Sequence, residues 1–163
     1  MPKGSEALTA ARKEEIITAC AKLYETMSFK EITIKEIGNA TSFTRTSIYN
    51  YFQTKEEIFL ALLEREYQLW NQRLRQIRAE HGKMTRLEFA KALAHSLEER
   101  KNLLKILSMN HYDMEENSRL ERLVEFKVAY GQSLAEVRQC LDQFFPEMTV
   151  QDKQDFIFTF FPF

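Results

Sequence analysis

Residues that interrupt helices are scarce inside this chain, and this constrains its fold more than any other feature. The 163 residues contain four Gly and three Pro, and Pro2 and Pro162 lie at the two ends. A β-sandwich or β-barrel needs many turns that contain Gly or Pro, so these folds are disfavoured. Hydrophobic residues make up 44% of the chain and charged residues 29%, a mixture typical of a globular protein and not of a disordered one. We therefore predict an all-α fold.

Capping patterns and apolar spacing together predict where the helices lie. A Thr followed three residues later by an acid is typical of a helix N-terminus, because the hydroxyl accepts a hydrogen bond from a free N–H of the first turn. Four such pairs precede apolar residues at helical spacing, namely Thr33/Glu36, Thr54/Glu57, Thr85/Glu88 and Thr149/Asp152. The predicted helices cover residues 9–27, 34–40, 44–51, 55–81, 86–99, 102–109 and 118–145, with a last helix from about residue 150. We expect Gly82 to end the fourth helix and residues 110–117 to form a polar loop.

Residues 33–55 carry the pattern of a helix-turn-helix, in which two short helices are separated by a three-residue turn and flanked by longer helices. We expect Gly38 to let the two short helices approach closely. The expected shared core consists of Ile37, Phe43, Ile48 and Phe52. The second short helix then leaves outward Arg45, Thr46, Ser47, Tyr49, Asn50 and Tyr51. Since Arg can bind guanine and Asn can bind adenine in the major groove, this set predicts a DNA-recognition helix.

The same outward residues also have a plainer interpretation. Tyr49 and Tyr51 could be core aromatics, and Arg45 could be a solvated surface charge. The charge distribution weakly favours DNA binding, because residues 1–55 contain eight Lys or Arg against six Asp or Glu, whereas residues 101–163 contain seven against ten. Lys35 and Lys55 add cations on both sides of the motif.

Residues 37–58 resemble the signature of tetracycline-repressor-type (TetR) regulators in their sequence, IGNATSFTRTSIYNYFQTKEEI. The most specific part is Ile-Tyr-x-Tyr-Phe-x-x-Lys-Glu-x-Ile, and the resemblance covers about residues 10–65. It implies a dimer that binds DNA through the helix-turn-helix and binds a small ligand through its C-terminal helices. By position, it implies base contacts for Arg45, Thr46 and Asn50, and a base or phosphate contact for Lys35. It implies phosphate contacts for Thr33, Ser47, Tyr49, Tyr51 and Lys55, and we add the capping residue Thr44 to the DNA-binding set.

The chain departs from the family pattern at three positions. Gly38 stands where Ala is usual, Ser42 stands where the turn usually has Gly, and Ser28 stands where Gly is usual near the end of the first helix. A Ser in a left-handed turn costs about 1 kcal/mol relative to Gly, so we expect Ser42 to affect the geometry of the turn.

These observations predict a DNA-binding domain over residues 1–54 and a helical regulatory and dimerisation domain over residues 55–163. The predicted function is transcriptional regulation by a ligand-responsive repressor that binds a palindromic operator as a homodimer. One alternative is a ligand-independent architectural or division-control protein bound to DNA. Another is a helical enzyme or interaction module with an incidental helix-turn-helix. The chain carries no catalytic motif, so we expect neither enzymatic activity nor a cofactor.

Two sets of apolar residues in the C-terminal part are candidate functional surfaces. The first could line a pocket for an apolar or aromatic effector and could equally be plain core: Trp70, Leu74, Leu93, Leu97, Leu103, Leu107, Met109, Phe126 and Tyr130. The second is a candidate dimer interface: Val128, Leu134, Val137, Leu141, Phe144, Phe156 and Phe160. The chain stops on Phe163 within a run rich in Phe, so we expect further residues beyond it.

The remaining polar and reactive residues indicate no further site. Cys20 and Cys140 are too few for a disulfide framework and are expected to be small buried residues. A cluster between two predicted helices has no metal-ligand spacing, so a solvated loop is expected there and no metal: His111, Asp113, Glu115 and Glu116. Without a signal peptide or an apolar run of 18 residues, the chain is expected to be cytoplasmic.

Overall fold

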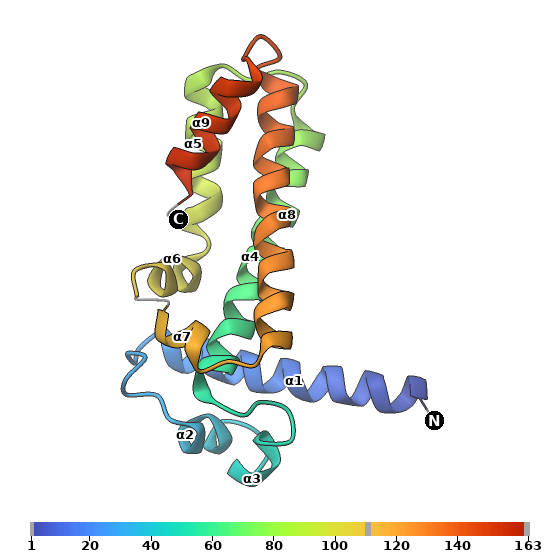
Figure 1. The fold of residues 1–163 in the computed structure, drawn as a ribbon, viewed down its shortest axis with the longest axis vertical. Coiled ribbons are helices and arrows are strands. Elements are labelled where there is room, and N and C mark those ends of the chain that lie inside the picture. Colours follow the sequence, from blue (N-terminus) through green and yellow to red (C-terminus); the bar gives the residue numbers. More distant parts are fainter. Residues whose placement is uncertain (1, 110–111, 162–163) are drawn as a thin grey trace. The chain divides into compact units, whose positions relative to one another are not determined.

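A computed structural model describes residues 2–109 and 112–161, and within these ranges it contains helices and no strand. The helices in chain order are α1 (Pro2–Tyr24), α2 (Ile34–Asn39), α3 (Arg45–Ile48), α4 (Lys55–Glu80), α5 (Arg86–Glu98), α6 (Lys101–Leu107), α7 (Tyr112–Glu116), α8 (Leu120–Phe144) and α9 (Val150–Phe160) (Figure 1). The all-α prediction is confirmed. The expectation of a loop over residues 110–117 is wrong in part, because α7 forms there.

Two helices differ most in length from the prediction. α1 begins seven residues earlier than expected and ends at Tyr24. Pro2 is compatible with this start, because N–H groups in the first turn have no partner within the helix. α3 covers only four residues, and the chain continues beyond it in turns, with the N–H of Tyr51 donating to the carbonyl of Ile48 at 2.9 Å.

α4 ends at Glu80 without a left-handed glycine, so the expected cap at Gly82 is wrong. None of the glycines in the described part of the chain has a positive φ. The side-chain amide of Gln143 donates instead to the carbonyls of Arg78 and His81, at 2.9 and 2.7 Å. These bonds satisfy acceptors that a helix C-terminus leaves free.

All four predicted capping Thr residues accept the expected hydrogen bond at their hydroxyl, whereas the reciprocal bond to the acid forms in only some of them. Each hydroxyl accepts from the N–H three residues later, at 3.0–3.2 Å: Thr33, Thr54, Thr85 and Thr149. Asp152 also accepts from the N–H of Thr149 at 3.4 Å, which completes a reciprocal capping box. Glu57 differs, because its carboxylate accepts from the N–H of Gln53 at 2.9 Å.

Contacts divide the chain into two compact units. The first contains Met1–Leu63 and Asn110–Phe126, and the second contains Glu64–Met109 and Lys127–Phe163. α4 and α8 each contribute residues to both units. The expected domain boundary after residue 54 falls inside the first unit, because the start of α4 packs on α1, with the rings of Tyr24 and Phe59 in edge contact at 5.0 Å. The functional division at residue 54 stays a prediction.

Each unit has its own buried core. In the first unit the fully buried side chains include Ile16, Tyr24, Ile37, Ile48, Phe52 and Phe59. In the second unit, the indole N–H of Trp70 donates to the hydroxyl of Ser96 at 2.9 Å, which satisfies a buried donor. Cys20 and Cys140 are buried, and burial raises the pKa of the Cys140 thiol to about 11. Both cysteines thus fit the prediction of small buried residues.

Candidate DNA-binding interface

The two short helices meet where Gly38 allows it. A Cβ at Gly38 would lie 3.4 Å from the backbone N of Arg45 and 3.5 Å from Cδ1 of Ile48. α2 starts at its cap Thr33, and α3 starts at Thr44, whose hydroxyl accepts from the N–H of Ser47 at 3.2 Å. The predicted close approach of the two helices at Gly38 is thereby confirmed, and the space there would admit a methyl group in ordinary contact.

The turn between α2 and α3 is bonded to α1. Both the backbone N–H and the hydroxyl of Ser42 donate to one carboxylate oxygen of Glu15, each at 2.9 Å. Within the turn, Thr41 Oγ1 donates to the carbonyl of Gly38 and accepts from the N–H of Phe43. No described residue other than Gly has a positive φ, so Ser42 avoids the left-handed conformation considered from the sequence. The usual glycine is therefore unnecessary in this turn.

Residues 44–51, here called the recognition segment, present polar side chains on a buried support. Ile48 is fully buried, as are Ile37 of α2 and Phe52, whereas Phe43 is only half-buried. The exposed side chains are those of Thr44, Arg45, Thr46, Tyr49 and Asn50. Tyr49 is 44% exposed, so it is not a core aromatic. Ser47 and Tyr51 are half-buried, and residues 37–55 contain no acid.

An arginine that the sequence analysis missed lies beside this segment. Arg12 of α1 donates to the hydroxyl of Tyr51 at 3.3 Å, and its guanidinium lies 5.6 Å from the centre of the Phe43 ring. Arg12 is exposed and precedes the buried Ile16 by one helical turn. Only the packing of α1 against the motif brings this cation next to the recognition segment.

The two predicted lysine contacts differ in their surroundings. Lys35 is exposed on α2. The ammonium of Lys55 donates to the carbonyl of Phe29 at 2.7 Å and lies 4.0 Å from the centre of the Phe29 ring. Burial lowers the pKa of Lys55. Lys55 thus binds the loop between α1 and α2, and its position in the sequence did not indicate this contact.

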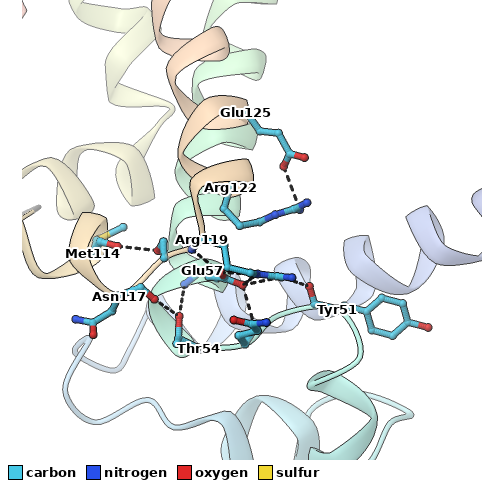
Figure 2. Close-up of polar contacts among 10 residues, drawn as sticks. Tyr51, Thr54, Glu57, Met114, Asn117, Arg119, Arg122 and Glu125 are labelled. Atoms are coloured by element: carbon cyan, nitrogen blue, oxygen red, sulfur yellow. Dashed lines mark hydrogen bonds and ion pairs between the residues drawn. The ribbon is translucent and has the colours of Figure 1, made fainter.

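Glu57 and Arg119 form an ion pair behind the recognition segment, with a shortest separation of 2.9 Å (Figure 2). Glu57 is fully buried. Burial raises the pKa of this carboxyl, but hydrogen bonds from the side chain of Arg119 and from the backbone of Gln53 and Arg119 outweigh it, so the pKa is lowered. The spacing of Thr54 and Glu57 predicts only a capping role for Glu57, and no sequence pattern points to Arg119, which is 62 residues away.

Two family models match this chain. The model for bacterial regulatory proteins of the tetR family matches residues 16–62, which include the whole helix-turn-helix. The model for the tetracyclin repressor-like C-terminal domain matches residues 64–163. The chain belongs to the TetR family of transcriptional regulators. The resemblance inferred from residues 37–58 is therefore confirmed, and it extends over the C-terminal part.

Individual relatives of this TetR-family regulator are distant. The HTH-type transcriptional repressor Rv1474c of Mycobacterium tuberculosis (strain ATCC 25618 / H37Rv) is 29% identical over 62 residues, which cover 38% of this chain. The match spans about a third (33%) of that relative's length. The solved structure of the fatty acid degradation regulator FadR from Bacillus halodurans has a TM-score of 0.62 at 17% identity, covering 91% of this chain and 79% of that one. This likeness shows the shared fold.

Among the described residues of the second unit, apolar side chains line a larger and a smaller cavity. The larger has a volume of about 820 Å³ and lies among α5, α9 and the end of α8. Of the predicted pocket residues, Leu93 and Leu97 line it. A smaller cavity of about 340 Å³ is lined by Trp70, Leu97, Leu103 and Leu107, together with residues such as Phe160 and Phe161. The other predicted residues line neither of these two cavities: Leu74, Met109, Phe126 and Tyr130.

The predicted dimer residues fall into two groups. Val137, Leu141 and Phe144 are covered by their own chain, so they present no surface to a partner. Val128 is 56% exposed, Leu134 is half-buried, and Phe156 and Phe160 stack on each other at 5.7 Å and line the larger cavity. Apolar side chains outside the predicted set are more exposed, and they include Val150 at 70% and Phe158 at 81% on α9. The interface itself stays a prediction.

The described residues add two negative findings. No described helix is long and apolar enough to cross a membrane. Within residues 2–109 and 112–161, no group of three or more His, Cys, Asp or Glu could hold a metal ion. Asp113, Glu115 and Glu116 lie on α7, and His111 is outside the described residues.

Proposed function

We propose that this TetR-family regulator is a repressor that binds a palindromic operator as a homodimer and is released by an apolar or aromatic effector. The observation that carries the proposal is the recognition segment, which exposes Arg45, Thr46 and Asn50 on the buried support of Ile37 and Ile48. These side chains can form hydrogen bonds and apolar contacts with base edges. Such a regulator works in the cytoplasm, where it meets its operator.

The shortness of the recognition segment favours a two-fold symmetric operator. One good bidentate contact discriminates between bases by about 1–3 kcal/mol, and so short a segment can make only a few such contacts. Useful specificity therefore needs two subunits on two half-sites. A two-fold protein requires a two-fold site, which is why we expect a palindrome.

Exposed apolar side chains support dimerisation through the C-terminal part. Phe158 and Val150 on α9 and Val128 on α8 are more than half exposed. Burial of a Phe or Val side chain is favourable by about 1.5–3 kcal/mol. A dimer in which the partner subunit covers these three side chains is therefore stabilised. A protein that stays monomeric at micromolar concentration in light scattering would contradict this part of the proposal.

The cavity of about 820 Å³ in the second unit supports the effector. Its volume lies within the range of small-molecule sites, and most of its lining side chains are apolar, among them Phe89, Leu93 and Leu141. A ligand can change DNA affinity only if it binds the two conformations of the protein unequally. The alternative of a ligand-independent architectural protein predicts little internal space, so the cavity favours the ligand-responsive repressor.

Selection of binding sites from random DNA with the purified protein tests the proposal. We expect the recovered sites to share a palindrome. Arg45→Ala should relax the base preference at one position of each half-site, whereas Lys101→Ala, which removes an exposed cation on α6, should leave the preference unchanged. Recovery of no common sequence would contradict operator recognition.

A further inference from the structure

Glu57 is the centre of a buried hydrogen-bonded cluster in the first unit (Figure 2). Its carboxylate accepts from the backbone N–H groups of Gln53 at 2.9 Å and Arg119 at 2.8 Å. The guanidinium of Arg119 adds bonds of 2.9 Å from both Nε and Nη2. A carboxylate that is fully buried thus has donors for both oxygens, which is what makes its burial tolerable.

The same cluster holds the end of the recognition segment. Nη2 of Arg119 also donates to the carbonyl of Tyr51 at 3.3 Å. The hydroxyl of Thr54 donates to the carbonyl of Asn117 at 2.8 Å (Figure 2). Together with Glu57, these residues form what we call the Glu57 clasp: Tyr51, Thr54, Glu57, Asn117 and Arg119. The clasp bonds residues 51–57 to Asn117 and Arg119, which lie just before α8.

The end of the recognition segment lies beyond α3, so contacts from other elements contribute to its position. α3 spans only Arg45–Ile48, and beyond it the chain is held by turn bonds until α4 begins at Lys55. The planar guanidinium of Arg119 can donate to Tyr51 and Glu57 at once, since its donors form a rigid fork. A lysine at the same position carries its three donors on one nitrogen, so it lacks the fork that spans both contacts.

We propose that Arg119, held by Glu57, is a positioning residue that sets the orientation of the recognition segment for DNA binding. The proposal rests on the proposed operator recognition. It assigns a role in DNA binding to a residue just before α8, far in the sequence from the helix-turn-helix. Arg119 contacts no DNA in this role and acts only through Tyr51 and Glu57.

The test compares Arg119→Lys, Glu57→Gln and the double variant on the duplex recovered with the wild-type protein. Each single variant should bind that duplex about tenfold more weakly, the ratio expected when one hydrogen bond to a charged group is lost. The double variant should bind no more weakly than the weaker single variant, because both changes break the same clasp. The slope of affinity against salt and the selected bases should stay unchanged, since no phosphate or base contact is removed.

Arg122→Lys is the matched control. Arg122 pairs with Glu125 at 3.0 Å, so its ion pair lies within α8 and does not involve the recognition segment (Figure 2). Its replacement should leave DNA affinity unchanged. All variants are measured below the unfolding transition seen by circular dichroism, so that a loss of stability alone leaves affinity unaltered.

Four outcomes would overturn the proposal. Wild-type affinity in folded Arg119→Lys would remove the positioning role, and a salt slope reduced by about one would make Arg119 a phosphate contact instead. Additive losses in the double variant would show that Arg119 and Glu57 act separately. Failure of the wild-type protein to select any sequence would contradict the proposed function first, and the positioning role with it.

Discussion

One carboxylate oxygen of Glu15 on α1 accepts both the backbone N–H and the hydroxyl of Ser42, each at 2.9 Å. This contact joins α1, the long helix that precedes the helix-turn-helix, to the turn before the recognition segment. It also explains how Ser can occupy a turn where the family usually has Gly. The conformation is not left-handed, and the side chain of Ser42 supplies a bond that Gly could not make.

We expect this contact to make the protein more stable above pH 4.5 than below it. The backbone and side-chain hydrogen bonds of Ser42, in that order, lower the pKa of Glu15 from its usual 4.5 in the folded state. A lowered carboxyl pKa gives stability that is present above the unfolded pKa and is lost as the pH falls through the folded pKa. Glu15→Gln should therefore lower the melting temperature at pH 7, and the difference from wild type should shrink toward pH 3. Glu6→Gln, an exposed carboxylate on the same helix, is the control.

Gly38→Ala should stabilise the protein by about 0.5–1 kcal/mol, because Gly inside a helix is less favourable than Ala by that amount. The new Cβ would make ordinary contacts, the shortest being 3.4 Å to the backbone N of Arg45. Gly38→Leu should instead destabilise, since a larger side chain must displace that backbone. Urea unfolding measures both changes. Destabilisation by Ala as large as that by Leu would contradict the expected space at this position.

Lys35→Ala and Lys55→Ala should have different effects. Lys35 is exposed, so its replacement should reduce the salt slope of DNA binding by about one and leave stability nearly unchanged. Lys55 is held by the carbonyl and ring of Phe29, so its replacement should cost about 1–2 kcal/mol of stability. If Lys55→Ala reduced the salt slope of DNA binding as much as Lys35→Ala does, and left stability unchanged, the Lys55 ammonium would contact DNA and would not stabilise the fold.

Ala94→Phe should fill part of the larger cavity. Ala94 lines that cavity on α5, whereas the exposed Lys91 on the same helix does not. We expect Ala94→Phe to weaken binding of 1-anilinonaphthalene-8-sulfonate, an anionic dye whose aromatic rings bind apolar sites, and Lys91→Phe to leave it unchanged, both measured by fluorescence. Operator affinity without dye should be the same in both variants. Equal dye binding by Ala94→Phe and wild type would place the dye elsewhere.

The sequence by itself determined the class of this protein. The scarcity of Gly and Pro inside the chain predicted an all-α fold, and the run from Ile37 to Ile58 predicted the TetR family. Both signals are local, because capping hydroxyls, apolar spacing and the motif residues lie within one or two helical turns of each other. For the same reason the caps at Thr33 and Thr149 were found correctly.

Only the tertiary structure decided which residues that are distant in the sequence contact each other. Glu57 looked like a capping acid, and it proved to be the buried partner of Arg119, 62 residues later. Lys55 looked like a phosphate contact, and its ammonium binds the carbonyl of Phe29. No periodicity predicts such pairs, because they depend on which helix faces pack together. The low Gly and Pro content could not show that Arg119 donates to the carbonyl of Tyr51, just beyond the four-residue α3.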